Sequence, residues 1–253
     1  MFRKRDHVGL MPGERLCDLG RGGFRVIQMP GDDCFSQDSV LLADFVRVKR
    51  GSRVCDLAAG SGALAMLLLA RESAISCDLI EIREDLCDRA LRTAAMNKVS
   101  DRVRAHAVDL REAAVRLGKG GFDLIVSNPP YYPLTGDDMT PSRRLARQQA
   151  ACDYRTLFEN VAALLRCHGR LCLCFPAGQV LDVSAELKNH GLEPKRLRFV
   201  SSYAHKAPYL ALLEGMKGAK PGLRLMPQLV QFERPGEWTT DMKAIYKEGG
   251  DIS

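Results

Sequence analysis

Four consecutive residues carry the groups needed to hold an amine for reaction: Asn128-Pro129-Pro130-Tyr131. The side-chain carbonyl of Asn128 and the backbone carbonyl of Pro129 can each accept one proton from the exocyclic amine of an adenine. Two such acceptors favour a pyramidal nitrogen whose lone pair points at an electrophile held in line. The prolines stiffen the loop, and the Tyr131 ring offers a stacking face for a flipped-out base. These four residues are our candidate catalytic residues; a plain rigid turn is the alternative interpretation.

A glycine-rich run at 56–62, Asp-Leu-Ala-Ala-Gly-Ser-Gly, forms a second candidate site between a predicted strand and a predicted helix. Glycines at such a turn let the backbone approach a ligand closely. Glu81 ends the next predicted strand, where an acidic residue can bind the ribose hydroxyls of an adenosine. Asp109 ends the third, where it can accept a hydrogen bond from an adenine amino group or cap the following helix. The pattern suits both a nicotinamide dinucleotide and S-adenosylmethionine.

Strands and helices alternate through most of the chain, which predicts a mainly parallel sheet with helices on both faces. Seven strands are expected, near 54–57, 75–82, 103–108, 122–127, 170–175, 195–202 and 209–214. The last two are joined by a link too short for a crossover helix, so they should pair antiparallel. The predicted fold class is therefore α/β, with a mainly parallel seven-stranded sheet and one reversed strand near the end, an arrangement that resembles the Rossmann-like fold of class I methyltransferases.

Composition sets limits on the class of protein. The chain has 253 residues, 46% hydrophobic and 27% charged, with a formal net charge of +6, as expected for a globular domain attractive to polyanions such as nucleic acid. No apolar run is long enough to cross a bilayer, and the basic N-terminus lacks the apolar segment of a signal peptide. The expectation is a cytoplasmic protein with no membrane partner. The nine cysteines are expected to be reduced core thiols, with no metal site.

The motifs together resemble those of class I methyltransferases that act on amino nitrogens. More specifically, the chain is similar to bacterial tRNA1(Val) (adenine-37-N6)-methyltransferases over most of residues 14–246. The similarity rests on the run 35–43, Phe-Ser-Gln-Asp-Ser-Val-Leu-Leu-Ala, on the pair Tyr131-Tyr132, on 143–147, Arg-Arg-Leu-Ala-Arg, and on the tail at 214–223. The presence of Gln37-Asp38-Ser39 departs from some relatives and leaves that segment's role over the cofactor open.

The resemblance implies S-adenosylmethionine as cofactor and adenine 37 of a tRNA(Val) as target. The expected cofactor residues are Asp56, Ala58, Gly60, Gly62, Glu81, Ile82, Asp109, Leu110 and Asn128. Tyr132 and a group of basic residues are expected to bind the RNA, the arginines through its phosphates: Arg143, Arg144, Arg147, Lys217 and Lys220. The expected assembly is a monomer or homodimer without an obligate protein partner.

Several alternatives stay open at this point. A protein glutamine methyltransferase would use the same Asn-Pro-Pro-Tyr motif on a side-chain amide, and an rRNA or DNA methyltransferase would use it on another adenine. An RNA-binding module with a retained methyltransferase fold would not need Asn128. A nicotinamide oxidoreductase would not need the motif at all. The expected organisation is an N-terminal extension with a hairpin (1–34), a catalytic domain (35–215) and a C-terminal basic segment with a strand (216–253).

Overall fold

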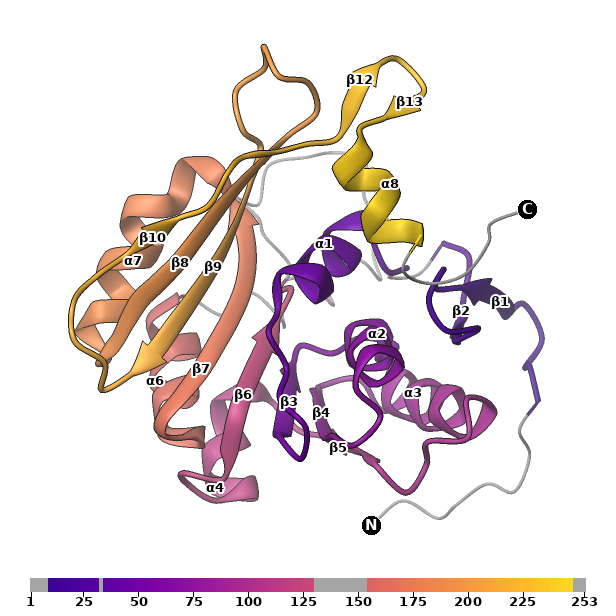
Figure 1. Cartoon of the computed structure of the whole chain (residues 1–253). Helices are drawn as coiled ribbons and strands as arrows, with labels where there is room; N and C mark the ends of the chain where they lie inside the picture. The colour runs from indigo at the N-terminus through magenta and orange to yellow at the C-terminus, as the bar shows by residue number, and fades with distance from the viewer. Residues whose placement is uncertain (1–8, 32–33, 130–153, 248–253) are drawn as a thin grey trace.

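The computed structural model describes residues 9–31, 34–129 and 154–247. Its centre is a nine-stranded sheet in the order β10-β8-β9-β7-β6-β3-β4-β5, with β11 also paired to β8 (Figure 1). The strands are β3 (Arg53–Leu57), β4 (Ser76–Glu81), β5 (Val103–Ala107), β6 (Phe122–Ser127), β7 (Leu165–Pro176), β8 (Leu192–Ser201), β9 (Leu210–Lys217), β10 (Arg224–Leu225) and β11 (Leu229–Val230).

Strand directions confirm the predicted topology. Strands β5, β4, β3, β6 and β7 run parallel to one another, whereas β9 runs antiparallel to both β7 and β8. The seven expected strands are all present with one reversed. Two short strands line the outer edge of β8 in parallel: β11, which lies in the C-terminal segment where the sequence predicts a strand, and β10, which the sequence did not predict. The carboxyl ends of the parallel strands meet at one end of the sheet, where α/β folds bind ligands.

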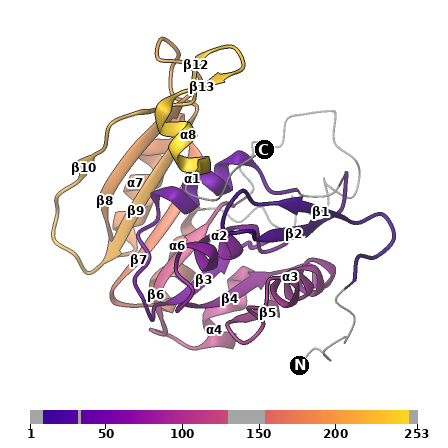
Figure 2. The same ribbon diagram turned by 45° about the vertical axis from the view of Figure 1, so that its right-hand side comes forward.

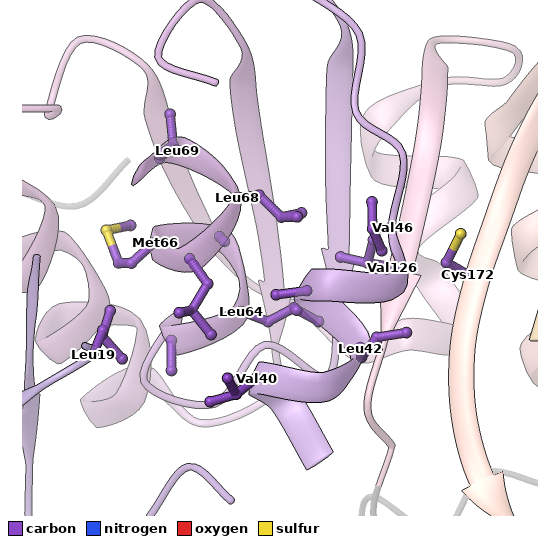
Figure 3. Close-up of a cluster of buried hydrophobic side chains, with 14 of the residues drawn as sticks. Leu19, Val40, Leu42, Val46, Leu64, Met66, Leu68, Leu69, Val126 and Cys172 are labelled. Carbon is purple, nitrogen blue, oxygen red and sulfur yellow. The ribbon is translucent and has the colours of Figure 1, made fainter. Parts of the chain in front are cut away.

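Helices cover the sheet on both faces, as Figures 1 and 2 show. One layer holds α1 (Gln37–Phe45), α2 (Ala63–Arg71) and α3 (Glu84–Met96); the other holds α4 (Ala113–Leu117), α6 (Tyr154–Leu164) and α7 (Val180–Asn189), with short 3-10 turns η1 (Leu110–Glu112) and η2 (Ala177–Gln179). Alternate strand side chains point to opposite faces. Val126 and Cys172 therefore join the core under α1 and α2 (Figure 3), and Ile125 and Leu173 join the opposite core.

The two ends of the described chain pack onto the α1 side of the sheet. The hairpin of β1 (Arg15–Asp18) and β2 (Arg25–Gln28) confirms the predicted one and lies beside α3. After β11, the hairpin of β12 (Phe232–Arg234) and β13 (Glu237–Trp238) leads into α8 (Thr240–Lys247). Met242 and Ile245 of α8 are buried in the same core as α1 and α2. Within the described ranges, no helix combines the length and apolar character needed to span a membrane.

Three arginines hold the end of α1. A helix leaves its last carbonyl groups without intrahelical partners. Arg71 donates from Nη1 to the carbonyls of Ala43 and Val46, in the second case at 3.0 Å. Arg196 donates to the carbonyl of Phe45 at 3.0 Å, and Arg170 to that of Arg47 at 2.6 Å. Glu214 on β9 forms ion pairs with both Arg196, at 2.8 Å, and Arg170, at 3.4 Å. This arrangement, the arginine clamp (Arg71, Arg170 and Arg196), fixes α1 against β7, β8 and β9.

A buried ion-pair network ties the N-terminal hairpin to α3. The Glu14 side chain is 2% exposed and receives two hydrogen bonds from Arg92, at 2.6 and 2.7 Å, and one from Arg89 at 3.2 Å. The hydrogen bonds from Arg92, with smaller contributions from the Met11 backbone and Arg89, lower the pKa of Glu14 to about 2. The charged form of Glu14 is therefore part of the folded structure.

Replacing Glu14 tests this network. Glu14→Gln should lower the free energy of unfolding by about 3 kcal/mol at neutral pH, because it leaves buried arginines short of a counter-charge. As pH falls, the Glu14 carboxyl of the unfolded wild type takes up a proton near its ordinary pKa of 4.5, whereas the folded protein keeps it charged to a lower pH. Stability from Glu14 is thus present above pH 4.5 and lost as pH falls towards 2. Denaturant melts across that range should show a flatter fall for Glu14→Gln, and an unchanged slope for Glu112→Gln, an exposed control.

Candidate active site at the carboxyl end of the sheet

The glycine-rich turn follows β3 and has the backbone shape that its residue types predict. Gly60 and Gly62 have φ angles of 54° and 80°, in the left-handed region that glycine adopts without strain. A Cβ on Gly62 would also lie 3.2 Å from the Cβ of Ala90 and from Cδ1 of Leu79, so the close packing of α2, α3 and β4 requires glycine there. A Cβ on Gly60 would meet no atom within 4 Å. The turn is thus open on the side where a ligand can approach.

Two buried carboxylates brace this turn. Asp56 Oδ2 accepts a hydrogen bond from the Ala65 backbone at 3.2 Å. Glu81 Oε2 accepts one from the Gly60 backbone at 2.9 Å and Oε1 one from the Arg83 backbone at 3.1 Å. Burial raises the pKa of Asp56 to about 8, with a further rise from the charge of Glu81. Burial also raises the pKa of Glu81. The structure therefore brings Asp56, Gly60 and Glu81 together, as the sequence predicts.

Asp109 caps the turn after β5, as the alternative interpretation of this residue predicts. Its Oδ1 accepts a hydrogen bond from the Arg111 backbone at 2.9 Å, and its carboxylate pairs with the Arg111 guanidinium. Hydrogen bonds from Arg111 lower the pKa of Asp109. Three other predicted cofactor residues flank these groups: Ala58 has a φ of 57° in the glycine turn, half-buried Ile82 follows β4, and Leu110 begins η1 and packs against the core under α6.

Asn128 lies directly after β6, at the same end of the sheet as the glycine turn. Its Nδ2 donates to the hydroxyl of Ser39 on α1 at 3.0 Å. Its Oδ1 accepts a hydrogen bond from the thiol of Cys174 on β7 at 3.2 Å. Ser39 is 6% exposed and Cys174 is fully buried. Two elements besides β6 therefore set the direction of the amide, since a side chain fixed at both of its polar atoms cannot rotate freely.

Sequence reasoning missed Ser39 and Cys174 as site residues. Ser39 lies in the segment 37–39, whose role the sequence left open, and the structure assigns that segment to the first turn of α1. Cys174 was expected only as a core thiol, and it is buried in the core as expected. The available signal was position alone: Cys174 lies near the carboxyl end of the strand next to β6.

Several predicted substrate residues are not brought to this site. Lys217 pairs with Leu192, the first residue of β8, at the opposite end of the sheet from Asn128. Its ammonium donates to the carbonyls of Ala162 and Leu165, the latter at 2.7 Å, where it caps α6. Lys220 is exposed in the segment that follows β9, and its carbonyl accepts a hydrogen bond from Lys195. Pro129 follows Asn128 in the described chain, whereas the remaining predictions fall outside the described residues: Pro130, Tyr131, Tyr132, Arg143, Arg144 and Arg147.

Asp56 gives this site a pH-dependent stability of opposite sign to that of Glu14. Because the folded carboxyl has the higher pKa, the folded state holds a proton that the unfolded state releases between pH 3.8 and about 8. Stability should therefore fall as pH rises through this window. Asn is a neutral isostere of Asp. In denaturant melts, the free energy of unfolding of Asp56→Asn should therefore fall less between about pH 4 and 8 than that of the wild type. A slope equal to that of the wild type would contradict the raised pKa.

Asp78→Asn is the matched control on the neighbouring strand. Burial would raise the pKa of Asp78, but hydrogen bonds and charge from His106 and Arg53 lower it overall. Because the charged form of Asp78 stabilises the folded state, Asp78→Asn should lower the free energy of unfolding at neutral pH.

Comparison with solved structures confirms the fold class. A predicted O-methyltransferase from Agrobacterium tumefaciens, protein Atu636, is similar with a TM-score of 0.69 and 19% sequence identity, over 85% of this chain and 98% of that chain. At this identity the likeness bears on the fold alone.

Relatives by sequence carry a more specific name. A protein from Escherichia coli O157:H7 called "tRNA1(Val) (adenine(37)-N6)-methyltransferase" is 31% identical over 164 residues, which is 62% of this chain and 66% of the relative. A protein of the same name from Tolumonas auensis is 27% identical over 229 residues, or 89% of this chain and 94% of the relative. The match thus spans slightly less than two thirds of the Escherichia coli relative.

The family model described as the methyltransferase small domain matches residues 31–173. That range includes α1, the glycine turn, Glu81, Asp109 and Asn128, and it is more than half of the 253-residue chain. The cofactor expected from the sequence, S-adenosylmethionine, is the methyl donor of this class of fold. This chain therefore belongs to the methyltransferase small domain family.

Proposed function

We propose that this protein transfers a methyl group from S-adenosylmethionine to the N6 amine of an adenine in RNA, namely adenine 37 of a tRNA(Val). The observation that carries the proposal is the fixed amide of Asn128 at the carboxyl end of β6, beside the glycine turn. The shared name of the sequence relatives supports the same substrate. The Asn-Pro-Pro-Tyr run supplies the acceptors that an exocyclic amine needs.

The residues of the turn fit S-adenosylmethionine, which supplies the methyl group when bound. Glu81 is positioned to accept hydrogen bonds from the ribose hydroxyls, because a carboxylate can accept about four hydrogen bonds and two backbone donors leave capacity. The open side of Gly60 lets the backbone approach the ligand. We propose that Asp109 binds the adenine amino group while it also caps η1, and that Ala58, Ile82 and Leu110 line the pocket.

The chain's part in the reaction is to hold the target amine. The Asn128 side-chain carbonyl and the Pro129 backbone carbonyl each accept a hydrogen bond from the N6 amino group. These two hydrogen bonds direct the nitrogen lone pair at the methyl group. Ser39 and Cys174 fix the amide that does this. Tyr131 and Tyr132 are proposed to stack against the base, and Arg143, Arg144 and Arg147 to bind phosphates. Lys217 has a structural role as a cap of α6, so it is no longer the first candidate for RNA contact.

We also propose the division into the segments 1–34, 35–215 and 216–253, with the outer two packed on the catalytic domain. Burial of Met242 and Ile245 of α8 in the core of α1 and α2 supports this arrangement. The proposed location is the cytoplasm, where tRNA is available, and the proposed assembly is a monomer or homodimer.

A methylation assay tests the proposed function. The wild type should methylate tRNA, and digestion with mass analysis should yield N6-methyladenosine. Asn128→Ala should lower kcat by at least about 100-fold, as expected for loss of an oriented polar partner in a reaction, while binding of S-adenosylmethionine stays within a few fold. Parallel pools of rRNA, DNA and a glutamine peptide cover the alternatives. Methyl transfer to the peptide alone would overturn the proposal in favour of a glutamine methyltransferase.

The support of Asn128 by its two neighbours is separately testable. Cys174→Ala and Ser39→Ala should each lower kcat about 3- to 10-fold, the effect of losing one ordinary hydrogen bond. Cys174→Ser keeps a donor and should retain most of the activity. Cys172→Ala is the matched control, because Cys172 is equally buried on the same face of β7 but contacts Glu214 instead. Equal losses from Cys172→Ala and Cys174→Ala would show that only core packing is involved.

A further inference from the structure

We propose that the loop between β8 and β9, residues 202–209, is a surface on which a base of single-stranded RNA stacks, a few nucleotides away from the target nucleotide. The loop carries Tyr203, His205, Lys206 and Tyr209, and its residues 204–209 are exposed. This inference rests on the proposed function, because it concerns how the RNA substrate is held.

The loop opens at the same end of the sheet as Asn128. The first residue of β9, Leu210, pairs with Pro176, the last residue of β7, while Leu173 of β7 pairs with Ser127 of β6. β8 is three strand spacings from β6, which is about 14 Å. Stacked nucleotides rise roughly 3.4 Å each. A segment of about four nucleotides therefore reaches from the target position to the loop.

The Tyr203 ring contacts two other rings at this position, and we call the three residues the ring file (Phe232, Tyr203 and His205). Tyr203 and His205 are stacked, with centroids 5.7 Å apart and planes at 18°; Tyr203 and Phe232 are 5.8 Å apart at 39°. Backbone hydrogen bonds hold the file, from Phe232 to the Ser202 carbonyl at 2.9 Å and from Lys206 to the Tyr203 carbonyl at 3.0 Å. Figure 1 shows the loop projecting beside β12.

The spacing decides where a base can stack. Insertion between two rings needs about 7 Å, twice the stacking distance of roughly 3.4 Å. The rings of Tyr203 and His205 are closer than that. Tyr203 and Phe232 are half-buried, and His205 is exposed. A base therefore stacks at the outer end of the file, on His205, and the two inner rings keep His205 in place.

The charge around the ring file favours stacking over phosphate binding as the main interaction. Lys206 is the only Lys or Arg between Ser202 and Tyr209. On the neighbouring hairpin, Glu237 pairs with Arg234 at 3.3 Å and with Lys243 of α8 at 4.0 Å, and Glu233 is a second acidic residue, so the hairpin adds no net positive charge. Aromatic stacking accepts any base. The loop is thus suited to hold a flanking nucleotide without reading its identity.

The test is binding of a short, fluorescein-labelled, adenine-rich single-stranded RNA, followed by anisotropy at several salt concentrations. His205→Ala should weaken binding about tenfold, within the range for loss of one base–aromatic stack, without changing the salt dependence. His205→Phe should keep the affinity. Lys206→Ala should lower the salt slope by the equivalent of about one phosphate contact.

His168→Ala is the matched control, because His168 is an exposed histidine on β7 near the opposite end of the sheet. Thermal melts check that each variant is folded.

Because binding is measured without methyl transfer, the outcomes separate the two proposals. A wild type that binds RNA through His205 but forms no N6-methyladenosine overturns the proposed function and supports the stacking surface. Unchanged binding by His205→Ala overturns the stacking surface, whatever the enzyme methylates. Absence of RNA binding by the wild type, or His205-dependent binding of a glutamine peptide in its place, also overturns it.

Discussion

The positions of the groups at the candidate site depend on how α1 is anchored. A nine-residue helix has too few turns to be stable alone, and the last carbonyls of α1 would be costly to bury without donors. The arginine clamp supplies these donors from α2, β7 and β8. Glu214 in turn offsets the buried charge of Arg170 and Arg196. With its C-terminal end fixed in this way, α1 holds Ser39 at its other end against the amide of Asn128.

The site therefore has two structural parts with different origins. The glycine turn, Asp56 and Glu81 are set by neighbouring strands of the parallel sheet, through backbone hydrogen bonds over short distances. Asn128 is set from outside that unit, by α1 on one side and by β7 on the other. In the function that we propose, cofactor and target meet where β3 adjoins β6, between the strands β3 to β5 and the side of the sheet that contains the reversed strand β9.

The sequence predicts much of this fold because its signals are local. Buried strands such as Phe122–Ser127 are short apolar runs, and the antiparallel pairing of β8 and β9 follows from the length of their link. The contact between Ser39 and Asn128 joins residues 89 apart in the chain, and no local pattern encodes it. Lys217 was misleading because it lies close in sequence to the exposed Lys220, whereas the distant carbonyls of Ala162 and Leu165 bind its ammonium. β10, with only two residues, is too short to show any periodicity, whereas β11 lies in the C-terminal segment where a strand was expected.

The reversal of β9 has a consequence for how such a protein can change over evolutionary time. Parallel strands are connected by crossovers that run the length of the sheet, so altering one of them disturbs the core. β8 and β9 form a hairpin instead, and the residues that join them can be lengthened, shortened or exchanged at little cost to the buried strands. Variation in this connection is uncoupled from the glycine turn on the far side of β6. Selection can therefore alter the connection between β8 and β9 while the glycine turn and its supporting carboxyl groups stay constant.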